Sequence, residues 1–252
     1  MKLIDLSLPL EDEKYSQWPR IKVHHQKHAA SRWLLRFYFR LPFSYLRNRL
    51  GWANDRLTLS THSGTHLDAP WHFGPVVEGK QSRTIDEVPL EWCYGDGVVL
   101  DVRHCAHGEL ITPVDLQAAL RAGSSTLKSS DIVLLHTGMS RHYGTPDFFE
   151  RGPGMSREAT LWVLDHGVKV IGIDAWGFDL PLKLAARLAR QKKDKNFFWQ
   201  AHYAGIDREY CHIEQLTNLD LLPARGFKVA CFPIKVKRAS AGWCRVVAII
   251  EE

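Results

Sequence analysis

The chain has 252 residues, of which 45% are hydrophobic and 24% charged, and its formal net charge is +5. This composition is that of an ordinary globular protein with a substantial core, and it excludes a largely disordered chain. The basic residues fall in separate clusters rather than on one continuous stretch, which argues against nucleic acid as a partner.

The cysteines and the apolar segments indicate the cellular setting. The five cysteines include no CxxC pair, so neither a disulfide framework nor a zinc finger is expected. The start of the chain lacks the pattern of a signal peptide, and no run of eighteen apolar residues occurs. We therefore predict a cytoplasmic protein with no membrane partner.

The first fifty residues contain one predicted strand and a long aromatic stretch. Residues 3–10 alternate loosely between apolar and polar side chains, which predicts a β-strand attached to the core. Residues 31–50 predict two short amphipathic helices, because apolar residues recur near helical spacing and Pro42 interrupts them. The pattern favours packing on the core, and the alternative is an aromatic wall or lid over a ligand pocket.

Three predicted strands follow between residues 56 and 137. Residues 56–61 alternate apolar and polar side chains and lead directly to His62. Residues 97–102 and 131–137 are continuous apolar runs, which are typical of strands buried on both faces.

Two helices are predicted from their starting signals. Thr112 is placed as an N-cap, with Pro113 at the first helical position and Asp115 at the third, and Gly123 ends that helix. Ser156 begins a second helix that leads into a strand at 168–174.

The last third contains a basic helix around 181–195 and two closing strands in 227–236 and 244–252. No internal repeat or low-complexity linker marks a boundary, so one domain over 1–252 is expected. Strands alternating with helices predict an α/β fold, with a mixed β-sheet flanked by helices.

The segment from His62 to His72 contains the candidate metal ligands. His62, His66, Asp68 and His72 stand at even-numbered positions within eleven residues. An extended segment of that length would span roughly 35 Å, too far for one metal centre, so the chain must fold back on itself. Bends are expected at Gly64 and Pro70. Imidazole and carboxylate ligands without cysteine suit zinc, manganese or iron(II) at a catalytic site.

This segment resembles the HxGTHxDxPxH motif of a cyclase family that includes bacterial kynurenine formamidases, isatin hydrolases and some polyketide cyclases. Every motif position matches, and the resemblance extends to IDLSLPL, to GMSREATLWVLDHGVKVIGIDA and to HIEQLTNLDLLP. It implies the swivelling β/β/α fold of kynurenine formamidases. It also implies a metal-dependent amidohydrolase that acts on a small-molecule substrate, either an aryl formamide such as N-formylkynurenine or a cyclic amide.

The resemblance assigns two divalent ions, Zn²⁺ or Mn²⁺, to named residues. The first ion is assigned to His62, His66 and Asp68. The second is assigned to Asp68 and His202, with Glu214 contacting both ions. His72 remains as the catalytic acid or base, since an unperturbed imidazole titrates near neutral pH. His212, two residues before Glu214, competes for the assignment.

Four further expectations concern single residues, the reaction and the assembly. Trp18 matches an aromatic position that contacts substrate, with rim packing as the alternative. The family's usual Gly-Asp after Trp-Pro is replaced here by Arg20-Ile21, which favours a second function, a metal-dependent cyclase or dehydratase acting on a polyketide-like substrate. Family members are oligomers, so a homodimer or homotetramer is expected. Asp174 is left open between a ligand-orienting role and a turn or capping role.

Overall fold

The computed structural model of the protein describes residues 1–12 and 20–251. Their internal contacts divide the chain into two compact units. One unit joins Met1–Pro9 to Thr61–Glu252, and the other is Leu10–Ser60.

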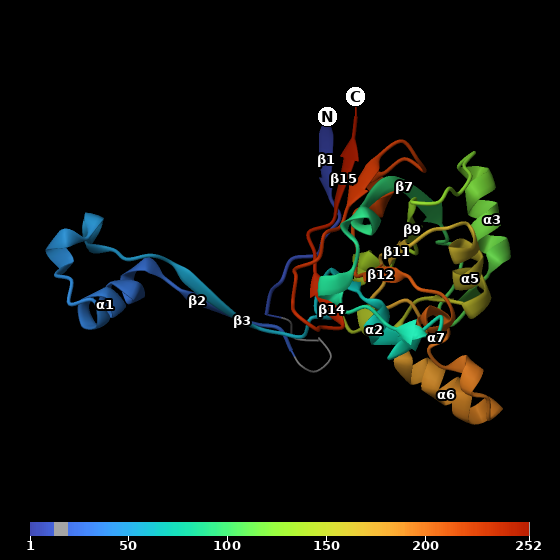
Figure 1. Cartoon of the computed structure of the whole chain (residues 1–252), viewed down its shortest axis with the longest axis horizontal. Coiled ribbons are helices and arrows are strands. Elements are labelled where there is room, and N and C mark those ends of the chain that lie inside the picture. Colours follow the sequence, from blue (N-terminus) through green and yellow to red (C-terminus); the bar gives the residue numbers. More distant parts are fainter. Residues whose placement is uncertain (13–19, 252) are drawn as a thin grey trace. The chain divides into compact units, whose positions relative to one another are not determined.

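The larger unit is built on a nine-stranded sheet with the order β1-β15-β13-β7-β9-β11-β12-β4-β14 (Figure 1). Its central strands β7, β9, β11 and β12 are parallel, whereas the other pairings are antiparallel. The mixed sheet expected from the sequence is therefore confirmed. In chain order the strands are β1 (Lys2–Asp5), β4 (His66–Asp68), β7 (Tyr94–Asp101), β9 (Ile132–His136), β11 (Val170–Ile173), β12 (Cys211–Glu214), β13 (Lys228–Ala230), β14 (Ala241–Trp243) and β15 (Val247–Ile250).

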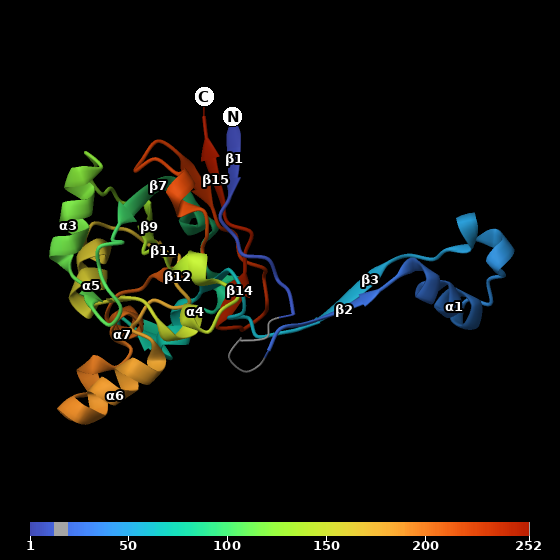
Figure 2. The ribbon, with the colours of Figure 1, turned by 180° about the vertical axis from the view of Figure 1, so that it is seen from behind.

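Strands β7 and β9 are buried on both faces over most of their length, as their continuous apolar runs predict, and β12 is also buried although its sequence CHIE contains no such run. Successive side chains alternate between two core clusters: Val98 and Leu100 of β7 join one cluster, and Val99 joins the other. Helices α3 (Pro113–Ala122) and α5 (Arg157–Asp165) lie side by side over the first cluster (Figure 1; Figure 2).

Both of these helices begin where the sequence predicts. Thr112 and Asp115 form a reciprocal capping box at the start of α3, and the hydroxyl of Ser156 accepts a hydrogen bond from the Ala159 N–H at the start of α5. The predicted basic helix is α6 (Leu182–Lys192). Among the described residues, no helix combines the length and apolar content needed to cross a bilayer.

Shorter elements complete the larger unit. The remaining helices are α2 (Pro70–Phe73), α4 (Asp147–Glu150) and α7 (Gln200–Asp207). The remaining strands are β5 (Val76–Val77), β6 (Lys80–Gln81), β8 (Leu110–Ile111) and β10 (Gly154–Met155). Single 3₁₀ turns occur at Ile85–Glu87, Leu90–Cys93, Met139–His142, Lys195–Phe197 and Leu219–Leu221. All five cysteines are free thiols, as predicted.

The smaller unit, Leu10–Ser60, is an antiparallel hairpin of β2 (Lys22–Gln26) and β3 (Asn54–Thr58) that carries α1 (His28–Tyr38) and two 3₁₀ turns, Phe43–Tyr45 and Arg47–Arg49. One α-helix therefore stands where two were predicted, because Pro42 is followed by 3₁₀ turns. The expectation that the aromatic stretch packs on the core is wrong. Phe37 is 72% exposed, Tyr38 80% and Tyr45 76%.

Candidate metal centre

Two neighbouring strands place four ionisable side chains on one face. His66 and Asp68 are two residues apart on β4, and His212 and Glu214 are two residues apart on β12, so each pair points to the same side of its strand. The antiparallel register sets His212 opposite Asp68 and Glu214 opposite His66. All four side chains are buried.

The chain folds back on both sides of β4, as the motif spacing requires. Gly64 adopts a left-handed backbone with φ of 64°, and Pro70 begins helix α2, which carries His72. The Nδ1 atom of His62 then lies 2.7 Å from Asp68 Oδ1, and the Nε2 atom of His72 lies 3.8 Å from Asp68 Oδ2. Asp68 is thus the point on which the motif converges.

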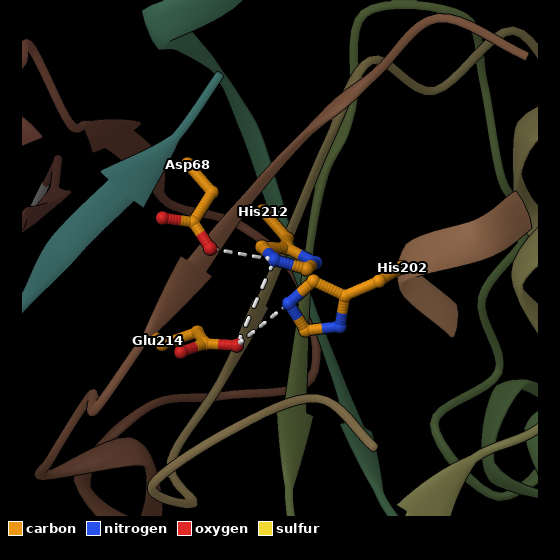
Figure 3. A group of neighbouring side chains, drawn as sticks. All are labelled: Asp68, His202, His212 and Glu214. Carbon is orange, nitrogen blue, oxygen red and sulfur yellow. Dashed lines mark hydrogen bonds and ion pairs between the residues drawn. The ribbon is translucent and has the colours of Figure 1, made fainter. Parts of the chain in front are cut away.

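His202 reaches the same cluster from helix α7. Its Nε2 atom lies 3.9 Å from Glu214 Oε1, and His212 Nε2 lies 3.6 Å from the same oxygen (Figure 3). His212 Nε2 is also 2.9 Å from Asp68 Oδ2. The imidazole and carboxylate groups of these four residues lie close enough to share one metal ion.

Three of the histidines have their outer ring nitrogen held by a hydrogen-bond acceptor. His66 Nδ1 lies 2.8 Å from the carbonyl oxygen of Gly64, and His202 Nδ1 is hydrogen-bonded to Asp179. The Tyr210 hydroxyl donates to the Ala201 carbonyl, so its oxygen can accept the Nδ1–H of His212 at 3.3 Å. When neutral, each ring therefore has its lone pair on Nε2, directed at a carboxylate, as in metal-bound histidines.

The hydrogen bonding at the centre is incomplete without a cation. His66 Nε2 and Asp68 Oδ1 are buried and make no hydrogen bond of acceptable geometry among the described residues, although His62 Nδ1 lies 2.7 Å from Asp68 Oδ1. Such orphaned polar atoms carry a large desolvation cost. Facing lone pairs of imidazole and carboxylate are the donor set of a divalent metal ion, so the residues present fit one.

The electrostatics of the cluster lead to the same conclusion. Burial lowers the pKa of His66, but the carboxylates of Asp68 and Glu214 outweigh it and raise that pKa to about 9. Burial and the nearby Asp68 carboxylate raise the pKa of Glu214 to about 7. Two buried carboxylates therefore attract positive charge to the point where His66 Nε2 is aimed. A cation bound there would take the place of the proton that His66 otherwise carries on Nε2.

A cavity of about 180 Å³ opens beside the cluster. The ionisable part of its lining consists of His62, His72, Asp179, His202 and Glu214. The rest of its lining is Trp176, Gly177, Phe178, Leu180, Leu182 and Trp199. The candidate metal centre is thus reached through a largely apolar and aromatic chamber, the usual form of a small-molecule site.

The structure brings together every predicted site residue that it describes: His62, His66, Asp68, His72, His202 and Glu214. Trp18 lies outside the described residues. His212 joins the cluster although it was weighed only as a competitor of Glu214. Two positions apart on a strand, both residues face the same way, and this alternation was the available signal. Asp179 was not predicted, because its role depends on contact with His202.

Asp174 belongs to a turn rather than to the cluster. Its carboxylate accepts hydrogen bonds from the Thr137 N–H at 2.7 Å, the Thr137 hydroxyl at 2.6 Å and the Gly138 N–H at 2.8 Å. Of the two roles left open by the sequence, these contacts support the turn-stabilising one.

The fold and the cluster define a class: mixed α/β proteins with a buried imidazole–carboxylate centre beneath an apolar cavity. Within that class the chain belongs to the cyclase family. The family model described as "Putative cyclase" matches residues 4–180.

Named relatives carry two activities. The kynurenine formamidase of Erythrobacter litoralis is 28% identical over 192 residues, which is 76% of this chain and 74% of the relative. That of Geobacillus thermodenitrificans is 30% identical over 204 residues, 79% of this chain and 83% of the relative. The isatin hydrolase of Roseibium aggregatum is 25% identical over 206 residues, covering 77% and 73%.

Solved structures share the fold over the whole chain. Isatin hydrolase A from Labrenzia aggregata, bound to benzyl benzoate, superposes with a TM-score of 0.75 at 23% identity, covering 100% of this chain and 94% of that one. An isatin hydrolase bound to the product analogue thioisatinate superposes with a TM-score of 0.74 at 20% identity, covering 100% and 93%.

Proposed function

We propose that the protein is a metal-dependent hydrolase that cleaves the C–N amide bond of an aryl formamide, such as N-formylkynurenine, or of a cyclic amide. One observation carries the proposal: a buried cluster of imidazoles and carboxylates with unsatisfied metal-facing atoms lies beneath an aromatic cavity. The relatives that resemble the chain over most of its length are named as amide hydrolases of these two kinds.

The proposed metal ligands form two groups that share Asp68. His62, His66 and Asp68 hold one ion, and Asp68, His202 and Glu214 hold the other; the position of His212 supports its addition to the second group. Nitrogen and oxygen donors suit Zn²⁺ or Mn²⁺. When bound, such ions supply positive charge for the developing oxyanion and a water activated for attack.

His72 is the proposed proton carrier. It lines the cavity, its side chain is 22% exposed, and it can therefore meet a substrate. Burial and neighbouring histidines lower its pKa to about 3 despite the attraction of Asp68, so the ring is neutral at neutral pH and one of its two nitrogens carries a lone pair. It can accept a proton there as attack begins and return it to the departing amide nitrogen.

The aromatic wall binds and shields the substrate. Trp199 stacks on His202 with ring centroids 4.4 Å apart and meets the edge of His72 at 5.4 Å. Its indole, with Trp176 and Phe178 across the lining, offers flat apolar surface to an aryl ring and excludes water from the reacting bond. A substrate contact by Trp18 stays a prediction.

The test combines metal analysis with turnover of two substrates. Purified protein should contain nearly two ions per chain and release formate from N-formylkynurenine or open isatin. The His66→Ala and Glu214→Ala variants should lose both metal and turnover. A purified protein that binds no metal even after reconstitution would refute the proposal. A cyclised product from a polyketide-like substrate, without hydrolysis of either amide, would select the cyclase or dehydratase alternative instead.

We further propose a cytoplasmic homodimer or homotetramer whose contacts involve the smaller unit. The support is the exposure of Trp33, Phe37, Tyr38 and Phe39 on α1 and at its end, since contiguous exposed aromatic side chains mark interaction surfaces. Light scattering coupled to size exclusion measures the mass directly, and a monomer at micromolar concentration would contradict the proposal.

A further inference from the structure

A second group of ligand-type side chains lies at the start of helix α3, outside the candidate metal centre. It consists of His104, Cys105 and Asp115, and one ligand atom from each lies within 4.8 Å of the others. We propose that these three residues bind a zinc-type divalent cation, with water in the fourth position. This peripheral site is independent of the proposed function, because none of its residues lines the cavity or belongs to the buried cluster.

The carboxylate of Asp115 is already oriented for such a role. Its Oδ2 atom accepts hydrogen bonds from the Thr112 N–H at 2.8 Å and from the Thr112 hydroxyl at 2.6 Å, which form the capping box of α3. The other oxygen, Oδ1, is turned toward His104 Nε2 at 3.0 Å. The helix cap therefore holds one ligand oxygen in place before any ion binds.

His104 approaches both other members of the group with the same nitrogen atom. Its Nε2 atom lies 3.0 Å from Asp115 Oδ1 and 3.6 Å from Cys105 Sγ. One cation bonded to nitrogen, sulfur and oxygen would explain both approaches.

The distances agree with the edges of a coordination tetrahedron. Zinc bonds of ordinary length to imidazole, thiolate and carboxylate give nitrogen–sulfur edges of about 3.6 Å and nitrogen–oxygen edges of about 3.3 Å. The observed separations are 3.6 Å and 3.0 Å. Small movements of the histidine ring, whose side chain is 56% exposed, would complete the geometry.

The ligand chemistry selects the class of ion. A thiolate and an imidazole favour Zn²⁺ or Co²⁺ and disfavour Mg²⁺ and Ca²⁺, which prefer oxygen ligands only. Binding replaces the thiol proton of Cys105, and that proton passes to solvent. The bound ion would tie the turn after β7, where His104 and Cys105 lie, to the first turn of α3.

Cobalt titration of the metal-stripped protein tests the site by its spectrum. Thiolate ligation produces a near-ultraviolet sulfur-to-cobalt charge-transfer band, and the candidate metal centre contains no cysteine to produce one. We expect the band in the wild-type protein and its complete loss in Cys105→Ser, with one fewer cobalt bound per chain. A wild-type spectrum without the band, or a band that persists in Cys105→Ser, would overturn the proposal.

Two exposed histidines provide a variant that should leave the fold intact and a matched control. His104→Ala should weaken the cobalt affinity at this site by more than about tenfold, the loss that removal of even a supporting group causes. His107→Ala, on the same exposed turn, should leave the band and the affinity unchanged. Equal cobalt affinities of His104→Ala and the wild-type protein at this site would contradict the assignment. Amide hydrolysis measured on the same preparations should be unaffected, so this site and the proposed function can fail separately.

Discussion

The β4–β12 region and the segment Leu10–Ser60 place their characteristic side chains in opposite environments. On β4 and β12 the ionisable residues are buried: His66, Asp68 and His212 are fully inaccessible. On α1, within Leu10–Ser60, the aromatic residues are exposed, with Phe37 at 72% and Tyr38 at 80%. Each arrangement reverses the usual rule that apolar groups are inside and charges outside.

The difference supports both proposals, a bound cation for one region and a partner surface for the other. Buried carboxylates and imidazoles are costly unless a counter-charge is present, so the β4–β12 region implies a cation. Exposed aromatic surface is unfavourable in water until another surface covers it, which supports the proposed partner contact through Leu10–Ser60. The requirement is electrostatic in one region and hydrophobic in the other.

The largest expected effect is at Asp68, on which both proposed ligand groups depend. Asp68→Asn keeps the size of the side chain but removes the charge that a metal needs. We expect hydrolysis to fall at least about a thousandfold, since bound metal supplies several kcal/mol of transition-state stabilisation. Elemental analysis should show loss of metal in parallel. Asp96→Asn, at a partly exposed position of β7 where the carboxylate pairs with Lys228, is the matched control. Metal retained by Asp68→Asn would contradict the electrostatic argument for a cation.

Asp174→Ala tests a buried carboxylate that has full hydrogen bonding and no need of a cation. The variant leaves two backbone N–H groups and the Thr137 hydroxyl without their acceptor. We expect the free energy of unfolding to fall by about 3 kcal/mol, as for other unsatisfied buried donors. Denaturant titration measures it, with the exposed Asp165→Ala as control. An equal loss of metal from folded Asp174→Ala would contradict the separation of turn and metal centre.

Asp179→Asn tests whether the Asp179 carboxylate orients His202 for metal binding. The carboxylate accepts a hydrogen bond from the Ala201 N–H at 2.8 Å and pairs with His202 Nδ1. Neutralising it should lower metal affinity or turnover by about 10–100-fold, the effect usual for groups that orient a metal-binding histidine. Competition with a chelator gives the affinity. Unchanged affinity together with unchanged turnover would show that the pairing is structural only.

The smallest effect on stability is expected in Leu10–Ser60. The double variant Phe37→Ser, Tyr38→Ser should change the free energy of unfolding by less than about 0.5 kcal/mol, because exposed side chains contribute little to folding. The same variant should shift the assembly toward monomer in light scattering. Lys22→Ser on β2 of the same unit is a control without aromatic surface. A large loss of stability with no change in mass would show that these side chains stabilise the fold rather than contact a partner.

The sequence by itself determined the features that depend on local pattern. Continuous apolar runs located the buried strands β7 and β9, Thr112 and Ser156 located two helix starts, and the spacing from His62 to His72 required the bend at Gly64. Each of these follows from interactions within a few residues, where periodicity and capping chemistry act directly.

Only the tertiary structure decided which distant residues meet. His212 is 144 positions from Asp68 and faces it because β12 pairs with β4 in one register out of many. Likewise, the helical spacing of the aromatic residues around α1 does not determine whether their side chains are buried or exposed. Register and burial arise from contacts distributed over the whole sheet, and such contacts leave no local signal in the sequence.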